Sequence, residues 1–172
     1  MSAGGTMRKV KKNSAKTTDD ELLSELELAL TVLWNSVHRW MSQRSQSSVM
    51  SGLSDLDVFL LHLLVYRNKP LRGIDLAFAL SIDDMHLVSY SLKKLTRSGL
   101  TVSMRMGKEV FYEPTPKGKD HYIDFLKDRK KYLEPAMKSI SRENLASLNT
   151  LVRALSGIYE QAARTAASAK GT

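Results

Sequence analysis

The stretch of sequence that decides the fold is residues 83–113, DDMHLVSYSLKKLTRSGLTVSMRMGKEVFYE. Its apolar residues first recur every three or four positions, as Val88, Leu92 and Leu95 do, and this spacing predicts a helix with one buried face. From Thr101 onward polar and apolar residues alternate, which predicts a β-strand. The stretch therefore predicts a helix that is followed directly by strands.

The boundaries of these elements are marked by residues with known preferences. Asp83 and Asp84 are both good N-cap candidates for the helix, and Gly99 is suited to the left-handed position just after a helix. Gly107-Lys108 is a two-residue turn with glycine first, which is typical of a type II′ hairpin. We expect the two strands to cover 101–106 and 109–113.

A second face of the predicted helix is polar, aromatic and cationic. His86, Tyr90, Lys93 and Arg97 are spaced by four, three and four residues, so they share one solvent-exposed side. Lysine and arginine can reach guanine or phosphate in a major groove, and cations at a hairpin tip can hold phosphate or enter a minor groove. The alternative to DNA contact is an amphipathic helix whose charged face is simply exposed to solvent. The predicted DNA-contacting residues are His86, Ser89, Tyr90, Lys93, Lys94, Arg97, Arg105, Lys108 and Arg72.

Two helices are expected before this stretch. Ser54 and Asp57 have the spacing of a helix start, and Pro70 ends that helix after about Tyr66. A short helix over 71–80 follows, and with the next helix it has the spacing of a helix-turn-helix. The residues expected to point inward from the short helix are Ile74, Ala77, Phe78 and Leu80.

Long helices are predicted at both ends of the chain. Thr18 and Glu21 form a capping-box pattern before a helix with a broad apolar stripe, and the polar segment 42–52 is expected to be a connection. Ser141 begins a last helix whose apolar residues repeat for three heptads, which is typical of helix–helix association. The residues predicted to form a dimer interface are Leu22, Leu26, Leu145, Leu148, Val152, Leu155, Tyr159 and Ala162.

Between the hairpin and the last helix, Thr115-Pro116 is expected to open a helix that runs to about Leu133, where Pro135 interrupts it. The predicted class is mainly α with a small β-hairpin wing. The predicted divisions are a disordered basic arm (1–18), a dimerisation helix and linker (19–52), a winged helix-turn-helix domain (53–116), dimerisation helices (117–168) and a frayed tail (169–172).

Composition excludes several classes of function. The 172 residues carry 26 lysines and arginines against 18 acids, a net charge of +8, and five of these cations lie in residues 1–18. The chain has no cysteine, which excludes disulfides, thiolate metal sites and a thiol switch. No apolar run is long enough to span a membrane and no signal peptide is evident, so we expect a cytoplasmic protein. The four histidines lack metal-ligand spacing, no catalytic constellation is present, and we expect neither a cofactor nor an enzyme.

The chain resembles the MarR (multiple-antibiotic-resistance regulator) family of bacterial winged-helix transcription factors over about 19–166. The resemblance is carried by Leu76-Ala77-Phe78-Ala79-Leu80, by Val88-Ser89 through Leu95-Thr96-Arg97-Ser98-Gly99-Leu100, and by Glu113-Pro114-Thr115-Pro116-Lys117-Gly118. It implies a homodimer, held by the first and last helices, whose winged domains bind a palindromic operator.

The sequence departs from the family pattern in ways that affect base recognition. The segment Leu80–Gly99 is one residue longer than usual, Tyr90 stands where arginine is common, and the wing lacks the family's Asp-x-Arg motif. Asp83 and Asp84 could repel phosphate or accept a hydrogen bond from cytosine, although helix capping is the better account.

Family members often bind effectors between the dimerisation helices and the winged domain, which implies a small aromatic or anionic ligand here. The candidate ligand-binding residues are Trp34, His38, Met41, His62 and Tyr66, and ordinary packing is the alternative explanation for them. The function predicted from the sequence is a homodimeric, sequence-specific, ligand-responsive regulator of transcription, with a repressor favoured over an activator. The competing hypothesis is a winged-helix module that binds proteins.

Overall fold

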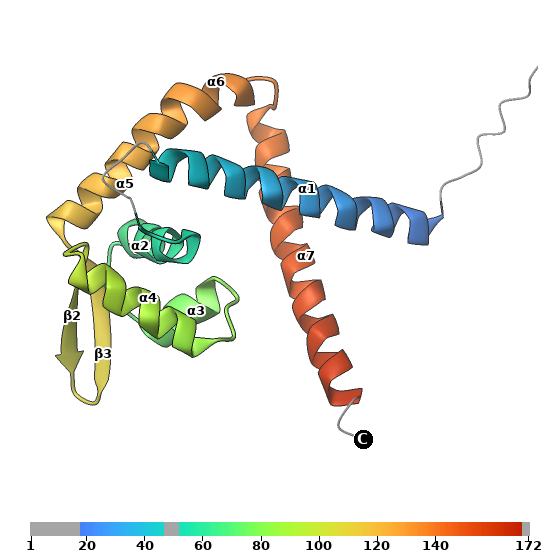
Figure 1. Ribbon diagram of the computed structural model, residues 1–172. Helices are drawn as coiled ribbons and strands as arrows, with labels where there is room; N and C mark the ends of the chain where they lie inside the picture. The colour runs from blue at the N-terminus through green and yellow to red at the C-terminus, as the bar shows by residue number, and fades with distance from the viewer. Residues whose placement is uncertain (1–17, 47–51, 170–172) are drawn as a thin grey trace, which may run out of the picture. The chain divides into compact units, whose positions relative to one another are not determined.

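The structure, a computed structural model, describes residues 18–46 and 52–169 (Figure 1). The chain divides into two compact units, Met1–Phe59 and Leu60–Thr172. The predicted class of fold is confirmed: helices dominate and a small antiparallel sheet is the only other regular structure among the described residues. Except for Thr18 and Ala169, the predicted basic arm (1–18) and the predicted frayed tail (169–172) lie outside the described residues.

The first unit contains α1 (Asp19–Gln46) and the beginning of α2 (Asp55–Arg67). The start of α1 is the predicted capping box, because the Thr18 amide donates to Glu21 Oε2 at 2.8 Å and the Glu21 amide donates to Thr18 Oγ1 at 3.2 Å. Ser54 and Asp57 form a second reciprocal pair at the start of α2, at 2.7 and 3.3 Å. Both helix starts therefore follow from the local sequence.

The C-terminal end of α1 corrects a prediction. The polar segment 42–52 was expected to be a connection, but the helix continues through Gln46. Arg44 is buried, and its guanidinium lies 5.9 Å from the centre of the Trp40 ring, four residues earlier. A packed cation–π pair along the helix thus supports a last turn whose composition alone suggested a loop.

The sheet in the second unit has the order β1-β3-β2, with β1 at Leu71–Arg72, β2 at Thr101–Met106 and β3 at Glu109–Pro114. The β2–β3 hairpin has the predicted register and turn, with Gly107 at φ +63°. The short strand β1 was not predicted, because residues 71–80 were assigned wholly to a helix. Its two residues pair with Tyr112 and Phe111, so the central strand β3 has a neighbour on both sides.

Helices pack against this sheet, and the core of the unit is aliphatic. α3 (Gly73–Ala79) and α4 (Met85–Arg97) lie side by side and contact the sheet. The fully or almost fully buried apolar residues of this unit are Leu60, Leu61, Leu64, Leu76, Ala77, Val88, Leu92, Leu95 and Leu100. Burying such side chains is the main stabilising contribution to a domain of this size.

Two residues of α3 do not lie where the sequence predicted. Ile74 and Phe78 were expected to point inward, yet their side chains are 59% and 87% exposed. α3 begins at Gly73 instead of Leu71, since Leu71 and Arg72 belong to the sheet. The face of α3 that packs against α4 and the sheet buries Leu76 and Ala77, and it leaves Ile74 and Phe78, which are one turn apart, exposed to solvent.

The helix after the hairpin also differs from the prediction. Pro135 was expected to interrupt it, but the chain stays helical from α5 (Pro116–Asp128) through a π-helical turn (Arg129–Leu133) into α6 (Glu134–Met137). A proline removes one backbone donor and crowds the preceding turn, and a wider π-turn accommodates both effects without ending the helix. The Glu134 amide accordingly donates to the carbonyl of Arg129, five residues earlier.

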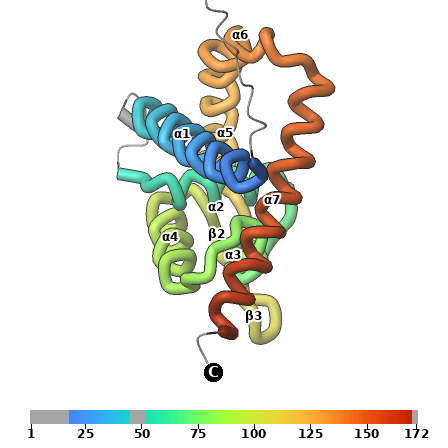
Figure 2. The backbone as a smooth tube through the Cα atoms, turned by 90° about the vertical axis from the view of Figure 1, so that its right-hand side faces the viewer, coloured from blue at the N-terminus to red at the C-terminus, as the bar shows by residue number. Residues whose placement is uncertain are grey.

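The last helix, α7 (Arg142–Ala169), begins where predicted, with the Asn144 amide donating to Ser141 Oγ at 3.1 Å. Figure 2 shows the course of α7 after α6. Most of its apolar side chains are exposed in this single chain. Leu151 and Ile158, outside the predicted seam, are more exposed than its large residues Leu145, Leu148, Val152 and Tyr159. Within the described residues, no helix is both long and apolar enough to cross a membrane.

Candidate nucleic-acid interface

The outer face of α4 presents the residues that were predicted to meet DNA. Val88, Ser91, Leu92 and Leu95 are buried on the inner face. His86, Tyr90, Lys93 and Arg97 are all exposed on the other side, with Tyr90 62% exposed, whereas Ser89 and Lys94 are half-buried at its margin. The structure thus brings these side chains together on one face. Their contact with DNA stays a prediction.

Asp84 has a structural role at the start of α4. Its Oδ1 accepts hydrogen bonds from the amides of His86 at 2.8 Å and Leu87 at 3.3 Å. A carboxylate in this position satisfies helix donors and interacts favourably with the positive end of the helix dipole. The capping role expected for Asp84 is therefore confirmed.

The end of α4 is held by the junction between β3 and α5. The Thr115 hydroxyl donates to the Gly99 carbonyl at 2.7 Å and accepts from the Gly118 amide at 3.1 Å. Lys117 Nζ donates to the Ser98 carbonyl at 3.0 Å. These contacts satisfy carbonyls that a helix end leaves without partners, and they attach α4 to the strand that leads out of the wing.

Gly118 shows how tightly this junction is packed. A Cβ atom at this position would lie 2.1 Å from the Leu100 carbonyl oxygen and 3.1 Å from Leu61 Cδ1. Only glycine allows the backbones to approach this closely. The sequence had identified Thr115–Gly118 as a junction but not its contacts with α4, because these contacts join residues far apart in the chain.

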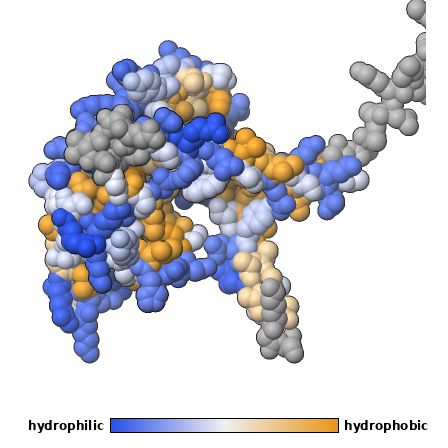
Figure 3. Space-filling view, in the orientation of Figure 1, coloured by the Kyte–Doolittle hydropathy of each residue, from blue (hydrophilic) through white to orange (hydrophobic). Residues whose placement is uncertain are grey.

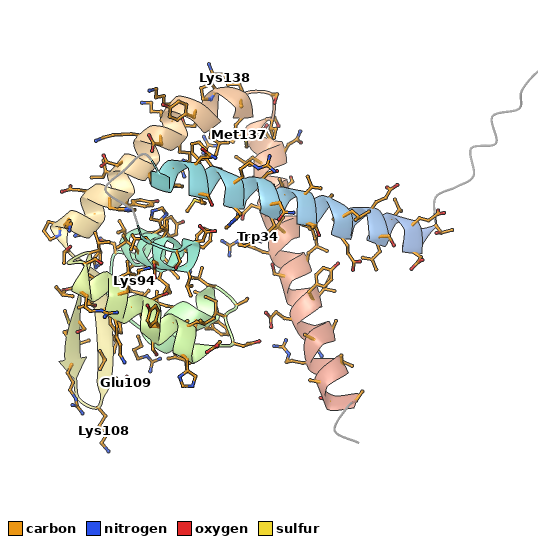
Figure 4. All side chains as sticks on the ribbon, in the orientation of Figure 1. Trp34, Lys94, Lys108, Glu109, Met137 and Lys138 are labelled. Atoms are coloured by element: carbon orange, nitrogen blue, oxygen red, sulfur yellow. The ribbon has the colours of Figure 1, made fainter. Side chains whose placement is uncertain are left out.

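The wing adds cations beside α4. Arg105 and Lys108 are exposed, and Lys108 lies at the hairpin tip (Figure 4). In the space-filling view the projecting tip is hydrophilic (Figure 3). Residues 89–108 contain five cations and no acid, so the edge formed by α4 and the wing favours a polyanion.

Arg72 is engaged within the protein. Its guanidinium donates to Asp75 at 2.7 and 2.8 Å and to Glu109 at 2.5 Å. The hydrogen bond to Asp75, and to a smaller extent that to Glu109, raises the pKa of Arg72. The hydrogen bond from Arg72 lowers the pKa of Asp75. The network ties the base of α3 to the wing. Contact of Arg72 with DNA stays a prediction, and the geometry favours a structural role.

The predicted effector-binding residues lie in different surroundings. In the first unit Trp34 is exposed, Met41 is buried, and His38 Nδ1 bonds Asp55 Oδ2. In the second unit the His62 ring packs against Phe125 and Tyr122, with ring centres 4.4 and 4.9 Å apart, whereas Tyr66 is exposed. No group of three or more potential metal ligands occurs in the described part of the chain.

Comparison with known proteins identifies the domain. Residues 53–118 match the family model described as "Winged helix DNA-binding domain". No curated protein sequence matches the chain.

Solved structures match most of the chain. FabT of Streptococcus pneumoniae, in complex with DNA, superposes with a TM-score of 0.65 at 18% identity, over 81% of this chain and 98% of its own. A MarR family protein from Bacillus stearothermophilus gives a TM-score of 0.62 at 15% identity, over 83% and 99%. BpsR of Bordetella bronchiseptica, whose DNA binding is regulated by 6-hydroxynicotinic acid, gives 0.56 at 16% identity, over 73% and 91%. The resemblance predicted from the sequence is confirmed at the level of the fold.

Proposed function

Starting from a chain that carries a winged helix DNA-binding domain within the fold of MarR regulators, we propose that this protein is a homodimeric transcription regulator that binds a palindromic operator. The observation that carries the proposal is the outer face of α4, where an aromatic ring and cations are exposed on a helix whose other face is buried. Such a helix fits the major groove and offers donors to bases and phosphates.

Dimerisation is supported by α7. Its exposed apolar residues would otherwise face water, and a second copy of the same helix is their natural partner. A dimer that holds two α4 helices about one turn of DNA apart, roughly 34–36 Å, matches a two-fold symmetric operator.

We further propose that the protein is a repressor and that a small molecule relieves repression when it binds the protein. Regulation by 6-hydroxynicotinic acid is a property of BpsR, a structural relative at 16% identity. It supports testing small aromatic acids here, with Trp34, His38, Met41, His62 and Tyr66 as the candidate contacts. An effector acts by binding the two spacings of the DNA-binding domains with different affinity.

The test is an electrophoretic mobility shift with duplexes from the chain's own promoter region. We expect a palindrome from that region to bind more tightly than random DNA of equal length, and affinity to fall steeply with salt. Equal affinity for the palindrome and for random DNA would refute sequence-specific regulation.

A second candidate, a module that binds proteins, is favoured by one observation. Phe78 and Ile74 form an exposed apolar pair on α3, and aromatic residues are enriched at protein–protein interfaces. A partner recovered in a pulldown and lost with Phe78→Ser, combined with no mobility shift on any duplex, would support this candidate over the first.

A further inference from the structure

A shallow pocket lies between α4 and the β2–β3 hairpin, which forms the wing. It has a volume of about 400 Å³ and is lined by Lys93, Thr96 and Arg97 of α4, Ser103 of β2 and Tyr112 of β3. All five residues belong to the winged domain, and three of them, Thr96, Ser103 and Tyr112, were not among the predicted contacts. The pocket therefore joins the two elements that were predicted separately to meet DNA.

The fold places these side chains together. Ser103 and Tyr112 are directly opposed in the β2–β3 register, so their side chains leave the same face of the sheet. Lys93 and Arg97 are four residues apart on α4, which puts them on adjacent turns of one helix face. The Thr96 hydroxyl is already engaged, because it donates to the Leu92 carbonyl at 2.9 Å and lies 3.0 Å from Thr101 Oγ1.

The other four groups are donors available to a ligand. Lys93, Arg97, Ser103 and Tyr112 make no side-chain hydrogen bond or ion pair with any described residue. An ammonium, a guanidinium and two hydroxyls can together donate to several oxygens of one anion. Arginine in particular matches the geometry of two phosphate oxygens.

The charge around the pocket also favours an anion. No acid occurs between Ser89 and Lys108, and the next one, Glu109, is bound by Arg72. Glu113 follows Tyr112 in β3, so it points to the opposite face of the sheet. The pocket is open, and an open site holds a free anion weakly. A phosphate presented by DNA that already contacts α4 and the wing has a high effective concentration there.

We propose that this pocket is a clamp for one backbone phosphate of the bound DNA. Ser103 and Tyr112 donate their hydroxyl hydrogens to the phosphate oxygens, and Lys93 and Arg97 supply the positive charge. The clamp rests on the proposed function as a DNA-binding protein. Through it, these four residues determine how tightly the protein binds DNA and where it sits along the backbone, but not which base sequence it prefers.

The first experiment removes the hydroxyls without removing their bulk. Ser103→Ala with Tyr112→Phe is compared with the wild type by fluorescence anisotropy on the operator and on random duplex, after circular dichroism has verified the fold. We expect both affinities to fall by about the same factor, roughly three- to tenfold, with their ratio unchanged. Unchanged affinity on both duplexes would overturn the clamp and leave the proposed function intact. A fall confined to the operator would show base readout and would also overturn it.

The second experiment measures charge. Arg97→Gln should reduce the slope of log affinity against log salt by about 1, because about 0.9 of a counterion is released per phosphate contacted. Lys127→Gln is the matched control, since Lys127 is exposed on α5 and paired with Asp124 at 2.8 Å. An equal change of slope in both variants would contradict a local clamp.

The third experiment locates the contacted phosphate and tests whether the pocket binds a phosphate of the DNA backbone or a free anion. Neutral methylphosphonate linkages are placed one at a time along the operator. We expect one linkage per half-site to weaken wild-type binding while having little further effect on the Ser103→Ala, Tyr112→Phe variant. The absence of such a linkage would refute the proposal. Binding of inorganic phosphate that requires the Ser103 and Tyr112 hydroxyls but leaves the affinity for DNA unchanged at equal ionic strength would assign the pocket to a free anion and overturn the clamp. If the operator proves no better than random DNA, the same variants still test the clamp on random duplex.

Discussion

Gly118 allows the start of α5 to pack closely against the turn that ends α4, because it has no side chain. Its backbone lies against the Leu100 carbonyl, directly after the turn that ends α4. We predict that Gly118→Ala lowers the free energy of unfolding by about 1–3 kcal/mol, because the added methyl group must displace backbone atoms. Chemical denaturation measures this. Gly73→Ala is the control, since a Cβ there would meet only side chains at ordinary distances of 3.5 Å or more. Equal effects of the two substitutions would contradict the role assigned to Gly118.

The Asp84 carboxylate makes a similar test possible at the other end of α4. Asp84→Ala removes the acceptor for two helix amides and should destabilise the domain by about 1 kcal/mol, whereas Asp84→Asn keeps an acceptor and should change stability little. Asp83→Ala is the matched control, because the described residues provide no hydrogen-bond partner for that carboxylate. Thermal unfolding distinguishes the three variants. A loss in Asp84→Asn as large as in Asp84→Ala would argue against capping.

At the scale of the element, we assign two tasks to the outer face of α4, base recognition and phosphate binding. Tyr90 is exposed and does not line the phosphate pocket, so we expect Tyr90→Ala to reduce the preference for the operator over random DNA by roughly 1–3 kcal/mol. The salt dependence should stay the same, because the residue is neutral. Competition anisotropy with both duplexes measures the ratio. An unchanged preference would refute the recognition face, although it would leave the winged domain itself untouched.

An element could be predicted from the sequence when the contacts that form it join residues close together in the chain. Helix starts at Thr18, Ser54, Asp84 and Thr115 were predictable because each cap is a contact over two or three residues. The two residues of β1 were not, since their strand exists only through pairing with β3 about 40 residues later. The exposure of Phe78 was not predictable either, because the face of α3 that packs inward is set by its contacts with α4 and the sheet, which join residues far apart in the chain.

The same distinction applies to the candidate site. The cationic face of α4 follows from helical periodicity and was predicted from the sequence. Ser103 and Tyr112 were not singled out, because their proximity to Lys93 and Arg97 depends on hairpin register and on how α4 lies against the sheet. Periodicity likewise identified the apolar seam of α7 but not Leu151 and Ile158, which extend its apolar surface beyond a simple heptad stripe.

At the scale of the whole molecule, the exposed apolar surface of α7 predicts assembly. Leu148→Glu combined with Val152→Glu should convert a dimer into a 19.3 kDa monomer in sedimentation velocity, because two charges would be buried in the seam. Affinity for the full operator should fall strongly, and weak binding to a half-site should persist. Thr150→Glu, on the other side of α7, should do neither. A wild-type chain that sediments as a monomer would contradict the proposed assembly.

The central position of β3 has a mechanical consequence. β3 is bonded along both edges, and the residues after it are bonded to the end of α4, so the hairpin and the helix are braced as one stiff body. We expect the amides of β3 to exchange with solvent among the slowest in the domain. Bending such a body is costly, whereas rotating it as a unit is not. In the proposed dimer, a regulatory signal would therefore tilt or shift the hairpin and α4 together without changing their internal structure. The spacing of the two α4 helices would then no longer match the helical repeat of DNA.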